Sequence, residues 1–231
     1  MNYQSILIIT YGRTGSTLLQ GVLNSLEGCL IRGENNNFCF PLFNTYQAIL
    51  KAKEKAANVP ADYPATVVNH PWYGAPLLNE KLFLIRCQSL VKELIIADES
   101  HSPQIQCYGF KERYTYPEIL NNFEEYLSFL TNIFPNVAFL FNTRNIENVL
   151  QSGWWRERDY NTSKEIILTT EERFNNYLKN YENTFHIQYE DVISKSSNFK
   201  NMLDFLGVSY DKKKIDAVLS QKHSYDIKQR I

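Results

Sequence analysis

Residues 12 to 17 combine two glycines, three hydroxyl side chains and one arginine, in the order Gly12, Arg13, Thr14, Gly15, Ser16 and Thr17. Glycine lets a ligand approach the backbone closely, while consecutive N–H groups, hydroxyls and a guanidinium donate hydrogen bonds to anionic oxygens. Any turn from strand to helix uses glycine and an N-capping hydroxyl, but a guanidinium between two glycines serves no turn geometry. The segment therefore predicts a cradle for a phosphate or sulfate group.

A buried strand and an amphipathic helix are predicted on either side of this cradle. The run from Ile6 to Ile9 is short and uninterrupted, as is typical of a strand covered on both faces in a parallel sheet. Leucines and a valine then recur at three- and four-residue spacing from Leu18 to Leu26, and Gly28 stands where a left-handed residue is expected to end a helix. The cradle should therefore lie at a helix start, where backbone N–H groups are free.

The cradle differs from the phosphate-binding loop of nucleoside triphosphatases, whose pattern is G-x-x-x-x-G-K-[ST]. Only two residues separate Gly12 from Gly15, and Ser16 stands in the place of the lysine. Without that lysine, and without an obvious strand-end aspartate to help hold magnesium, triphosphate hydrolysis is disfavoured. A single phosphate or a phosphosulfate fits these residues better.

The sequence from Arg13 to Leu19 resembles the amino-terminal signature of sulfotransferases that use 3′-phosphoadenosine 5′-phosphosulfate (PAPS), especially their bacterial and carbohydrate-modifying branch. That signature is a strand, a loop of the form [KR]-[ST]-G-[ST]-T and a leucine-rich helix. Family members often have a proline before the basic residue, where this chain has Gly12. The resemblance implies that Gly12, Arg13, Thr14, Gly15, Ser16 and Thr17 bind PAPS, that adenosine 3′,5′-bisphosphate (PAP) is the product, and that no metal is needed.

A second match follows a predicted strand from Val137 to Phe141. Arg144 comes directly after this strand, and Ser152 stands eight residues later, beyond a helical stretch. By the resemblance, this arginine and serine hold the 3′-phosphate of the nucleotide. Taken singly, Arg144 also suits a solvated helix start and Ser152 an ordinary polar helix position; their joint order and spacing favour the nucleotide.

A third match is the run from Ile187 to Val192, a short strand that leads into a helix over residues 199–208. Family members carry a similar Tyr-Glu-Asp here, and their tyrosine lies beside the adenine. The resemblance makes Tyr189 a nucleotide-binding residue, although a half-buried strand tyrosine is equally normal in a core. Glu190 and Asp191 suit a helix start.

Sulfuryl transfer needs a base for the acceptor hydroxyl and a cation for the charge that develops on the moving group. The resemblance assigns the base to Glu34, after a predicted second strand that we expect beside the first, and the cation to Lys111, at the end of a third strand, together with Arg13. In many relatives the base is a histidine two residues after such a lysine, where this chain has Arg113. Glu34 also suits an exposed turn, and Glu112 or Arg113 could replace Lys111 or pair with each other.

Local charges must bind the anion, because 24 basic and 25 acidic residues nearly balance. This balance does not favour a nucleic-acid or anionic-membrane partner. The four cysteines have neither a C-x-x-C pair nor zinc spacing with histidine, so reduced thiols are expected. No apolar run approaches ~20 residues, and no secretory signal precedes the first strand. We expect a cytoplasmic, bacterial enzyme without membrane insertion.

The remaining sequence predicts helices over residues 43–58, 82–97 and 123–134 that pack on the sheet. Prolines exclude regular structure between residues 59 and 76, and this segment is assigned to acceptor recognition, with Trp72 and Tyr73 as sugar-stacking faces or as parts of a packed surface loop. Residues 212–231 predict a helix and a basic tail. In that tail His223, Ser224 and Tyr225 either close the nucleotide site or are solvated.

Together these patterns predict a P-loop-like three-layer α/β fold, with a central parallel sheet flanked by helices, in a single sulfotransferase domain over residues 1–231. The expected activity is transfer of a sulfuryl group from PAPS to a hydroxyl of a carbohydrate, lipid or other small molecule. A small nucleotide-dependent kinase and a non-catalytic nucleotide-binding module are the alternatives.

Overall fold

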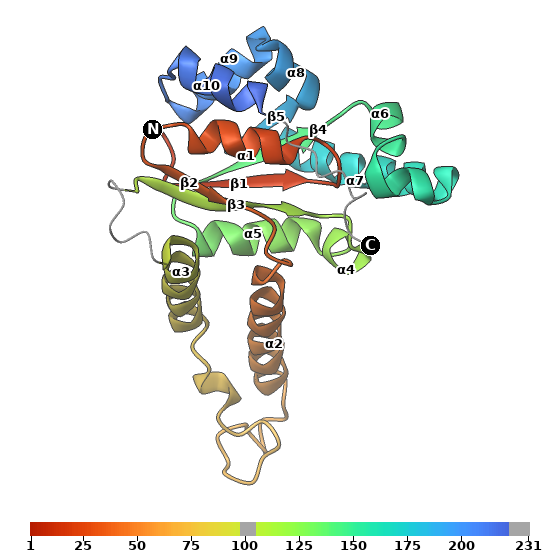
Figure 1. The fold of residues 1–231 in the computed structure, drawn as a ribbon. Helices are drawn as coiled ribbons and strands as arrows, with labels where there is room; N and C mark the ends of the chain where they lie inside the picture. Colours follow the sequence, from red (N-terminus) through yellow and green to blue (C-terminus); the bar gives the residue numbers. More distant parts are fainter. Residues whose placement is uncertain (98–104, 222–231) are drawn as a thin grey trace, which may run out of the picture.

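A parallel sheet of five strands forms the centre of the molecule in a computed structural model that describes residues 1–97 and 105–221 (Figure 1). The strand order is β2-β3-β1-β4-β5, and every neighbouring pair is parallel. The strands are β1 Ser5–Thr10, β2 Cys29–Arg32, β3 Cys107–Arg113, β4 Val137–Thr143 and β5 Thr184–Gln188. All carboxyl ends therefore meet at one edge of the sheet, where parallel α/β folds bind their ligands.

Helices cover both faces of the sheet, because side chains on β1 alternate between two hydrophobic cores. Leu7 and Ile9 point into one core, whereas Ile6 and Ile8 point into the other. The first core packs against α4 Pro117–Leu120, α5 Phe123–Ile133, α6 Ile146–Leu150 and α7 Tyr160–Asn180. The second packs against α1 Ser16–Asn24, α8 Tyr189–Ser194, α9 Ser197–Leu206 and α10 Lys212–Ser220. The predicted α/β fold, P-loop-like with three layers, is confirmed.

The position of β2 differs from the prediction. We expected the strand before Glu34 to lie beside β1, but β3 lies between them. Strand β3 is buried along nearly its whole length and suits a central position, whereas β2 has four residues, only one of them buried, and suits an edge. Glu34 still lies at the same edge of the sheet as the cradle, because β2 ends there.

The sequence predicted that helices over residues 43–58 and 82–97 pack on the sheet. The observed helices, α2 Cys39–Ala57 and α3 Glu80–Ile96, do not lie along it. They form an antiparallel arm that projects from the body beneath α5, and the loop that joins them lies at its far tip (Figure 1). Near the base, Phe43 and Val91 are buried in the first core. Towards the tip, Leu77 in the short 3-10 helix η1 Ala75–Leu77 is 84% exposed. The arm is therefore anchored only at its base.

Two helices end at other residues than the sequence predicted. Helix α1 ends at Asn24, and Gly28 adopts its positive φ of 70° in the turn before β2 rather than at the helix end. The helix predicted over residues 123–134 is α5, which ends one residue earlier.

His223, Ser224 and Tyr225 lie outside the described residues. Among the residues described, no helix is long and apolar enough to cross a membrane.

Candidate active site

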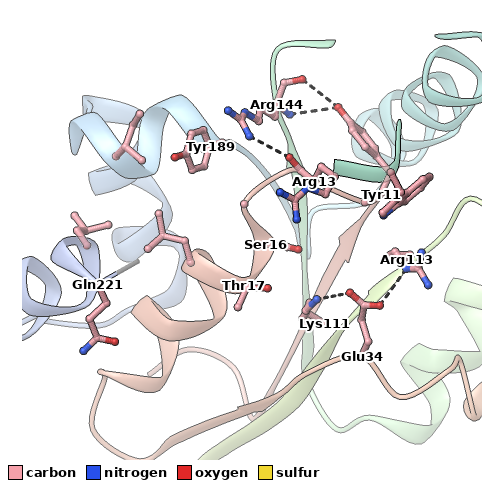
Figure 2. Close-up of a pocket in the computed structure, with 16 residues that line it drawn as sticks. Tyr11, Arg13, Ser16, Thr17, Glu34, Lys111, Arg113, Arg144, Tyr189 and Gln221 are labelled. Atoms are coloured by element: carbon pink, nitrogen blue, oxygen red, sulfur yellow. Dashed lines mark hydrogen bonds and ion pairs between the residues drawn. The ribbon is translucent and has the colours of Figure 1, made fainter. Parts of the chain in front are cut away.

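A cavity of about 430 Å³ lies at the carboxyl ends of β1, β3 and β4 (Figure 2). Segments far apart in the sequence form its walls: the turn after β1, Glu34 after β2, the end of β3, and the segments that follow β4 and β5. Its polar and charged lining comprises Tyr11, Arg13, Ser16, Thr17, Glu34, Lys111, Arg113, Arg144, Tyr189 and Gln221. Most of the predicted site residues therefore share one cavity.

The turn from β1 to α1 has the backbone that an anion cradle requires. Arg13 and Gly15 have positive φ angles of 72° and 74°, and such a conformation is costly for a residue with a Cβ atom. Among the described residues, no carbonyl accepts a hydrogen bond from the N–H groups of Gly15, Ser16 and Thr17 at the start of α1. These free donors lie beside the cavity, where an anion can accept from them.

The side chain of Thr14, predicted to bind the nucleotide, faces away from the cavity. It is fully buried, its hydroxyl lies 2.6 Å from that of Thr10, and it donates to the Tyr11 carbonyl at 3.2 Å. The Thr10 hydroxyl in turn donates to the Asn142 carbonyl at 2.9 Å. Thr14 thus ties the cradle to β1 and β4, because its side chain points into the fold rather than into the cavity.

Arg144 reaches the cradle from the end of β4. Its Nη1 donates to the Arg13 carbonyl at 3.3 Å, and its guanidinium lies 4.4 Å from the centre of the Tyr189 ring (Figure 2). Its Nε is buried without a hydrogen-bond partner in the described residues, and the Glu190 carboxylate is 4.0 Å away. A buried donor without an acceptor is costly, so this arginine suits an anionic ligand that supplies one.

Ser152 lies beside Arg13, although no helix carries it there. Helix α6 ends at Leu150, and Ser152 immediately precedes the 3-10 helix η3 Gly153–Glu157. Its hydroxyl accepts a hydrogen bond from Arg13 Nε at 3.1 Å. The spacing of eight residues between Arg144 and Ser152 thus spans a short helix and a turn, and it places both residues against the cradle.

Glu34 is held between two cations at the opposite end of the cavity. Lys111 Nζ lies 2.6 Å from Glu34 Oε1, and Arg113 Nε lies 3.1 Å from Oε2 (Figure 2). Burial alone would raise the pKa of Glu34, but the hydrogen bond from Lys111 and the charges of Lys111 and Arg113 outweigh it and lower that pKa. Glu34 is therefore an ionised carboxylate at neutral pH.

Alternation along β3 separates Glu112 from its neighbours. Lys111 and Arg113 point to the cavity, whereas Glu112 is almost fully buried on the other face. Its carboxylate accepts hydrogen bonds from the backbone N–H groups of Asn35, at 2.8 Å, and Asn37, at 3.0 Å. Its other oxygen accepts a hydrogen bond from the Arg113 N–H at 2.8 Å, but no ion pair joins the two side chains among the described residues. Glu112 thus lies outside the cavity lining and fixes the loop that presents Glu34.

Comparison with known proteins assigns the family. The model of a sulfotransferase family matches residues 5–212, which is most of the chain. The chain belongs to this sulfotransferase family. No curated protein matches it. Sulfuryl transfer is the general chemistry of the family, and the site described above lies within the matched residues.

Solved structures give weaker similarities to this sulfotransferase. Sulfotransferase STF9 from Mycobacterium avium is 11% identical, with 95% of this chain and 67% of that chain covered and a TM-score of 0.49. Sulfotransferase STF1 from Mycobacterium tuberculosis is 13% identical, with 99% and 73% covered and a TM-score of 0.45. Retinol dehydratase, solved with androsterone and the inactive cofactor PAP, is 14% identical, with 95% and 64% covered and a TM-score of 0.38. The family assignment therefore rests on the family model.

Two sets of site residues were missed from the sequence. The hydroxyl of Tyr11 donates to Glu171 Oε1 at 2.5 Å and accepts from the Arg144 N–H at 3.3 Å, so it joins the cradle to the end of β4. Trp154 and Trp155 stack with ring centres 4.1 Å apart, and Trp155 Nε1 donates to the Gly12 carbonyl at 2.9 Å. The adjacent tryptophans just after Ser152 were the available signal in the sequence.

Trp72 and Tyr73 lie away from this cavity of the sulfotransferase. Both belong to the tip of the arm, and Lys55 lies over the Trp72 ring at 5.2 Å. Neither residue lines the cavity among the described residues. Residues 59–76, assigned to acceptor recognition from the sequence, thus lie away from this cavity, because α2 and α3 carry the segment away from the sheet. No group of three or more metal-ligating side chains occurs in the part of the chain described.

Proposed function

We propose that this sulfotransferase transfers a sulfuryl group from PAPS to the hydroxyl of a small-molecule or glycan acceptor. One observation carries the proposal: Arg13, Arg144 and Lys111, from three separate segments, border one cavity together with the carboxylate of Glu34. Cations suit a doubly phosphorylated nucleotide, and the carboxylate suits an acceptor hydroxyl. A cytoplasmic location and a single domain over residues 1–231 remain predictions.

The donor would be held by the two arginine-bearing segments. The N–H groups of Gly15, Ser16 and Thr17, together with Arg13, suit the 5′-phosphosulfate. Arg144, whose buried Nε has no hydrogen-bond acceptor among the described residues, suits the 3′-phosphate together with Ser152, whose hydroxyl lies 3.1 Å from Arg13 Nε. Tyr189, whose ring lies against Gly15 and Arg144, suits the adenine.

Bound PAPS would supply a sulfur atom that accepts an oxygen nucleophile and a bisphosphate that leaves. Glu34 takes the proton of the acceptor hydroxyl as its oxygen bonds to sulfur, while the bond from sulfur to the phosphate oxygen breaks and PAP departs with the electron pair. Lys111 and Arg13 stabilise the negative charge on the transferring and leaving oxygens. The proton thus ends on Glu34, and the sulfuryl group ends on the acceptor.

This mechanism requires that the ion pair between Glu34 and Lys111 opens before Glu34 acts as a base. A carboxylate whose charge is satisfied by two cations is a weak base, as the lowered pKa of Glu34 indicates. Lys111 is 8% exposed and lines the same cavity as the cradle residues Arg13, Ser16 and Thr17. Transfer of Lys111 to the donor's sulfuryl oxygens would free Glu34 Oε1 for the acceptor hydroxyl.

Calorimetry with PAP and with ATP, followed by transfer of labelled sulfate from PAPS to a panel of hydroxyl compounds, tests the function. We expect PAP to bind more tightly than ATP and without added magnesium. Preference for ATP would indicate a kinase instead. Tight PAP binding without transfer to any glycan, lipid or phenolic hydroxyl would indicate a binding module.

The role of Glu34 has its own test. We expect Glu34→Gln to lower kcat by about 10²-fold or more, because general bases contribute on that order, while PAP binding stays within about threefold. Full activity of this variant would overturn the assignment of the base and leave the donor site intact.

A further inference from the structure

A second cavity, of about 560 Å³, adjoins the proposed donor cavity. Arg113 and Trp154 line both cavities. Arg113 is the residue whose Nε pairs with Glu34 at 3.1 Å, so the two spaces meet near the proposed base. A molecule in the second cavity therefore has a route to Glu34 along the side chain of Arg113.

The walls of this second cavity are largely apolar and aromatic. Tyr116, Pro117 and Leu120 contribute one side, and Trp154, Trp155 and Ile166 another. The tryptophan pair is rigid, because the rings stack and the hydrogen bond from Trp155 to Gly12 anchors them to the cradle. A volume of this size and a flat aromatic wall suit the ring or chain of a small molecule.

The charges around the second cavity are unequal. Its lining includes Arg113, Arg158 and Arg173 but one carboxylate, that of Glu165. Arg158 lies over both tryptophans, with its guanidinium carbon 4.5 Å from the Trp154 ring and 5.5 Å from the Trp155 ring. Within residues 1–97 and 105–221, no carboxylate lies within 4.0 Å of Arg158 or Arg173. Both guanidinium groups are thus available to an anion from outside the chain.

We propose that this second cavity binds the acceptor, and that the acceptor is an amphipathic hydroxy compound with an apolar ring or chain and one anionic oxygen group. The apolar part lies against Trp154 and Trp155, the anionic group pairs with Arg158 and Arg173, and the hydroxyl points past Arg113 to Glu34. This inference rests on the proposed function and narrows its acceptor class. It replaces Trp72 and Tyr73 as the acceptor-binding residues.

Binding of a matched pair of phenols tests the acceptor class without turnover. Hydroxyphenylpropionate and its methyl ester differ only in the anionic group. Binding is followed by tryptophan fluorescence in a Trp72→Phe background, so that the signal comes from Trp154 and Trp155. We expect the acid to bind at least about tenfold more tightly than the ester, because hydrogen bonds to charged groups carry that much free energy. Equal binding of acid and ester would overturn the proposal.

Arginine variants then locate the anion. Arg158→Gln and Arg173→Gln should each reduce the preference for the acid. Arg156→Gln, in η3 two residues before Arg158 but outside the cavity lining, should keep it. Equal behaviour of the Arg156 and Arg158 variants would contradict the assignment. Each titration is made with and without PAP, and PAP binding is measured in the same samples. Failure of the wild type to bind PAP counts against the donor site, whereas equal binding of the acid and the ester by a wild type that binds PAP counts against the acceptor site alone.

Discussion

The edge of the sheet and the arm are built in opposite ways. At the edge, the side chains of Arg13, Lys111 and Arg144 come from segments separated by many residues. Each donates a hydrogen bond to another segment: Arg13 to the Ser152 hydroxyl, Lys111 to the Glu34 carboxylate and Arg144 to the Arg13 carbonyl. The arm is one continuous segment, α2 to α3, whose tip exposes Leu77 and Val68, the latter at 76%. Charged groups are thus fixed where many elements meet, and the arm's order depends on its own two helices and on its base.

This difference indicates which parts of the fold can hold catalytic groups. A catalytic group must be held within a fraction of an ångström, and strand ends surrounded by several packed elements supply that rigidity. The arm has ion pairs and aromatic contacts of its own, such as the one between Tyr46 and Phe83. These contacts hold two helices together without converging on a cavity of the sheet edge.

The largest expected effect tests the claim that the arm is anchored only at its base. Phe43→Ala should lower the free energy of unfolding by about 3–5 kcal/mol, because it leaves a cavity among buried aromatic rings. Leu77→Ala, at the tip, should change it by less than about 0.5 kcal/mol. Denaturant unfolding of both variants measures the contrast. Comparable losses would mean that the tip is packed against something in solution.

The next effect compares two paired lysines, one in each region. Lys111→Met should lower kcat for sulfate transfer by about 10²–10³-fold, because it removes a cation from the proposed reaction centre. Lys53→Met, which breaks the ion pair of Lys53 with Glu80 on the arm, should leave kcat within about twofold. Steady-state kinetics with labelled PAPS gives both values. An equal fall for the two variants would place catalytic importance on the arm.

The sequence predicted the edge of the sheet better than it predicted the arm, and the reason is physical. The cradle from Gly12 to Thr17 is local: strand, turn and helix follow one another, so the type and order of residues determine its shape. Arg144 and Lys111 were assigned by the resemblance to the family. The structure places them at one edge because each lies at or near the end of a strand, and the ends of parallel strands meet there.

The strand order, the placement of α2 and α3, and the ion pairs of Glu34 depend on tertiary arrangement, so local sequence did not predict them. The insertion of β3 between β1 and β2 follows from the relative burial of whole strands. The periodicity of α2 and α3 predicts an apolar stripe but not whether that stripe meets the sheet or another helix. The ion pair of Glu34 with Lys111 and Arg113, residues far apart in the sequence, was visible only when the strands were in register.

Alanine substitution at two glycines in left-handed conformations distinguishes the cost of backbone strain from the cost of a steric clash at the site. Gly15, with a φ of 74°, has the Tyr189 ring 2.2 Å from the position that a Cβ atom would take, whereas Gly74 on the arm, with a φ of 81°, has nothing within 4 Å. Gly74→Ala should cost about 1–2 kcal/mol of stability from strain alone. Gly15→Ala should cost that amount and also weaken PAP binding about tenfold or more, because Tyr189 must move.

Thermal unfolding and PAP calorimetry of the two glycine variants give these values. A Gly15→Ala variant that binds PAP as the wild type does would show that Tyr189 is free to move and that it does not shape the nucleotide site. Loss of PAP binding in Gly74→Ala would instead indicate that the arm contributes to that site.

The smallest effect concerns the pH dependence of stability at the two carboxylates that pair with lysine. The folded-state pKa values of Glu34 and Glu80 are both lowered: at Glu34 the pairing with Lys111 and Arg113 outweighs burial, and at Glu80 the hydrogen bond from Lys53 comes first. A lowered carboxylate pKa contributes stability above the unfolded value of 4.5, and this contribution is lost as the pH falls through the folded pKa.

The difference in midpoint temperature between wild type and Glu34→Gln should therefore be greatest near neutral pH and should shrink below pH 4.5. Glu80→Gln should show the same sign with a smaller amplitude, because Lys53 is 32% exposed and solvent screens its charge more than that of Lys111. Thermal melts from about pH 7 to about pH 3 compare the two variants, since a lowered carboxylate pKa exerts its effect within that interval. A pH-independent difference for Glu34→Gln would mean that its ion pairs do not persist in solution, and the carboxylate would then be free to act as a base before any donor binds.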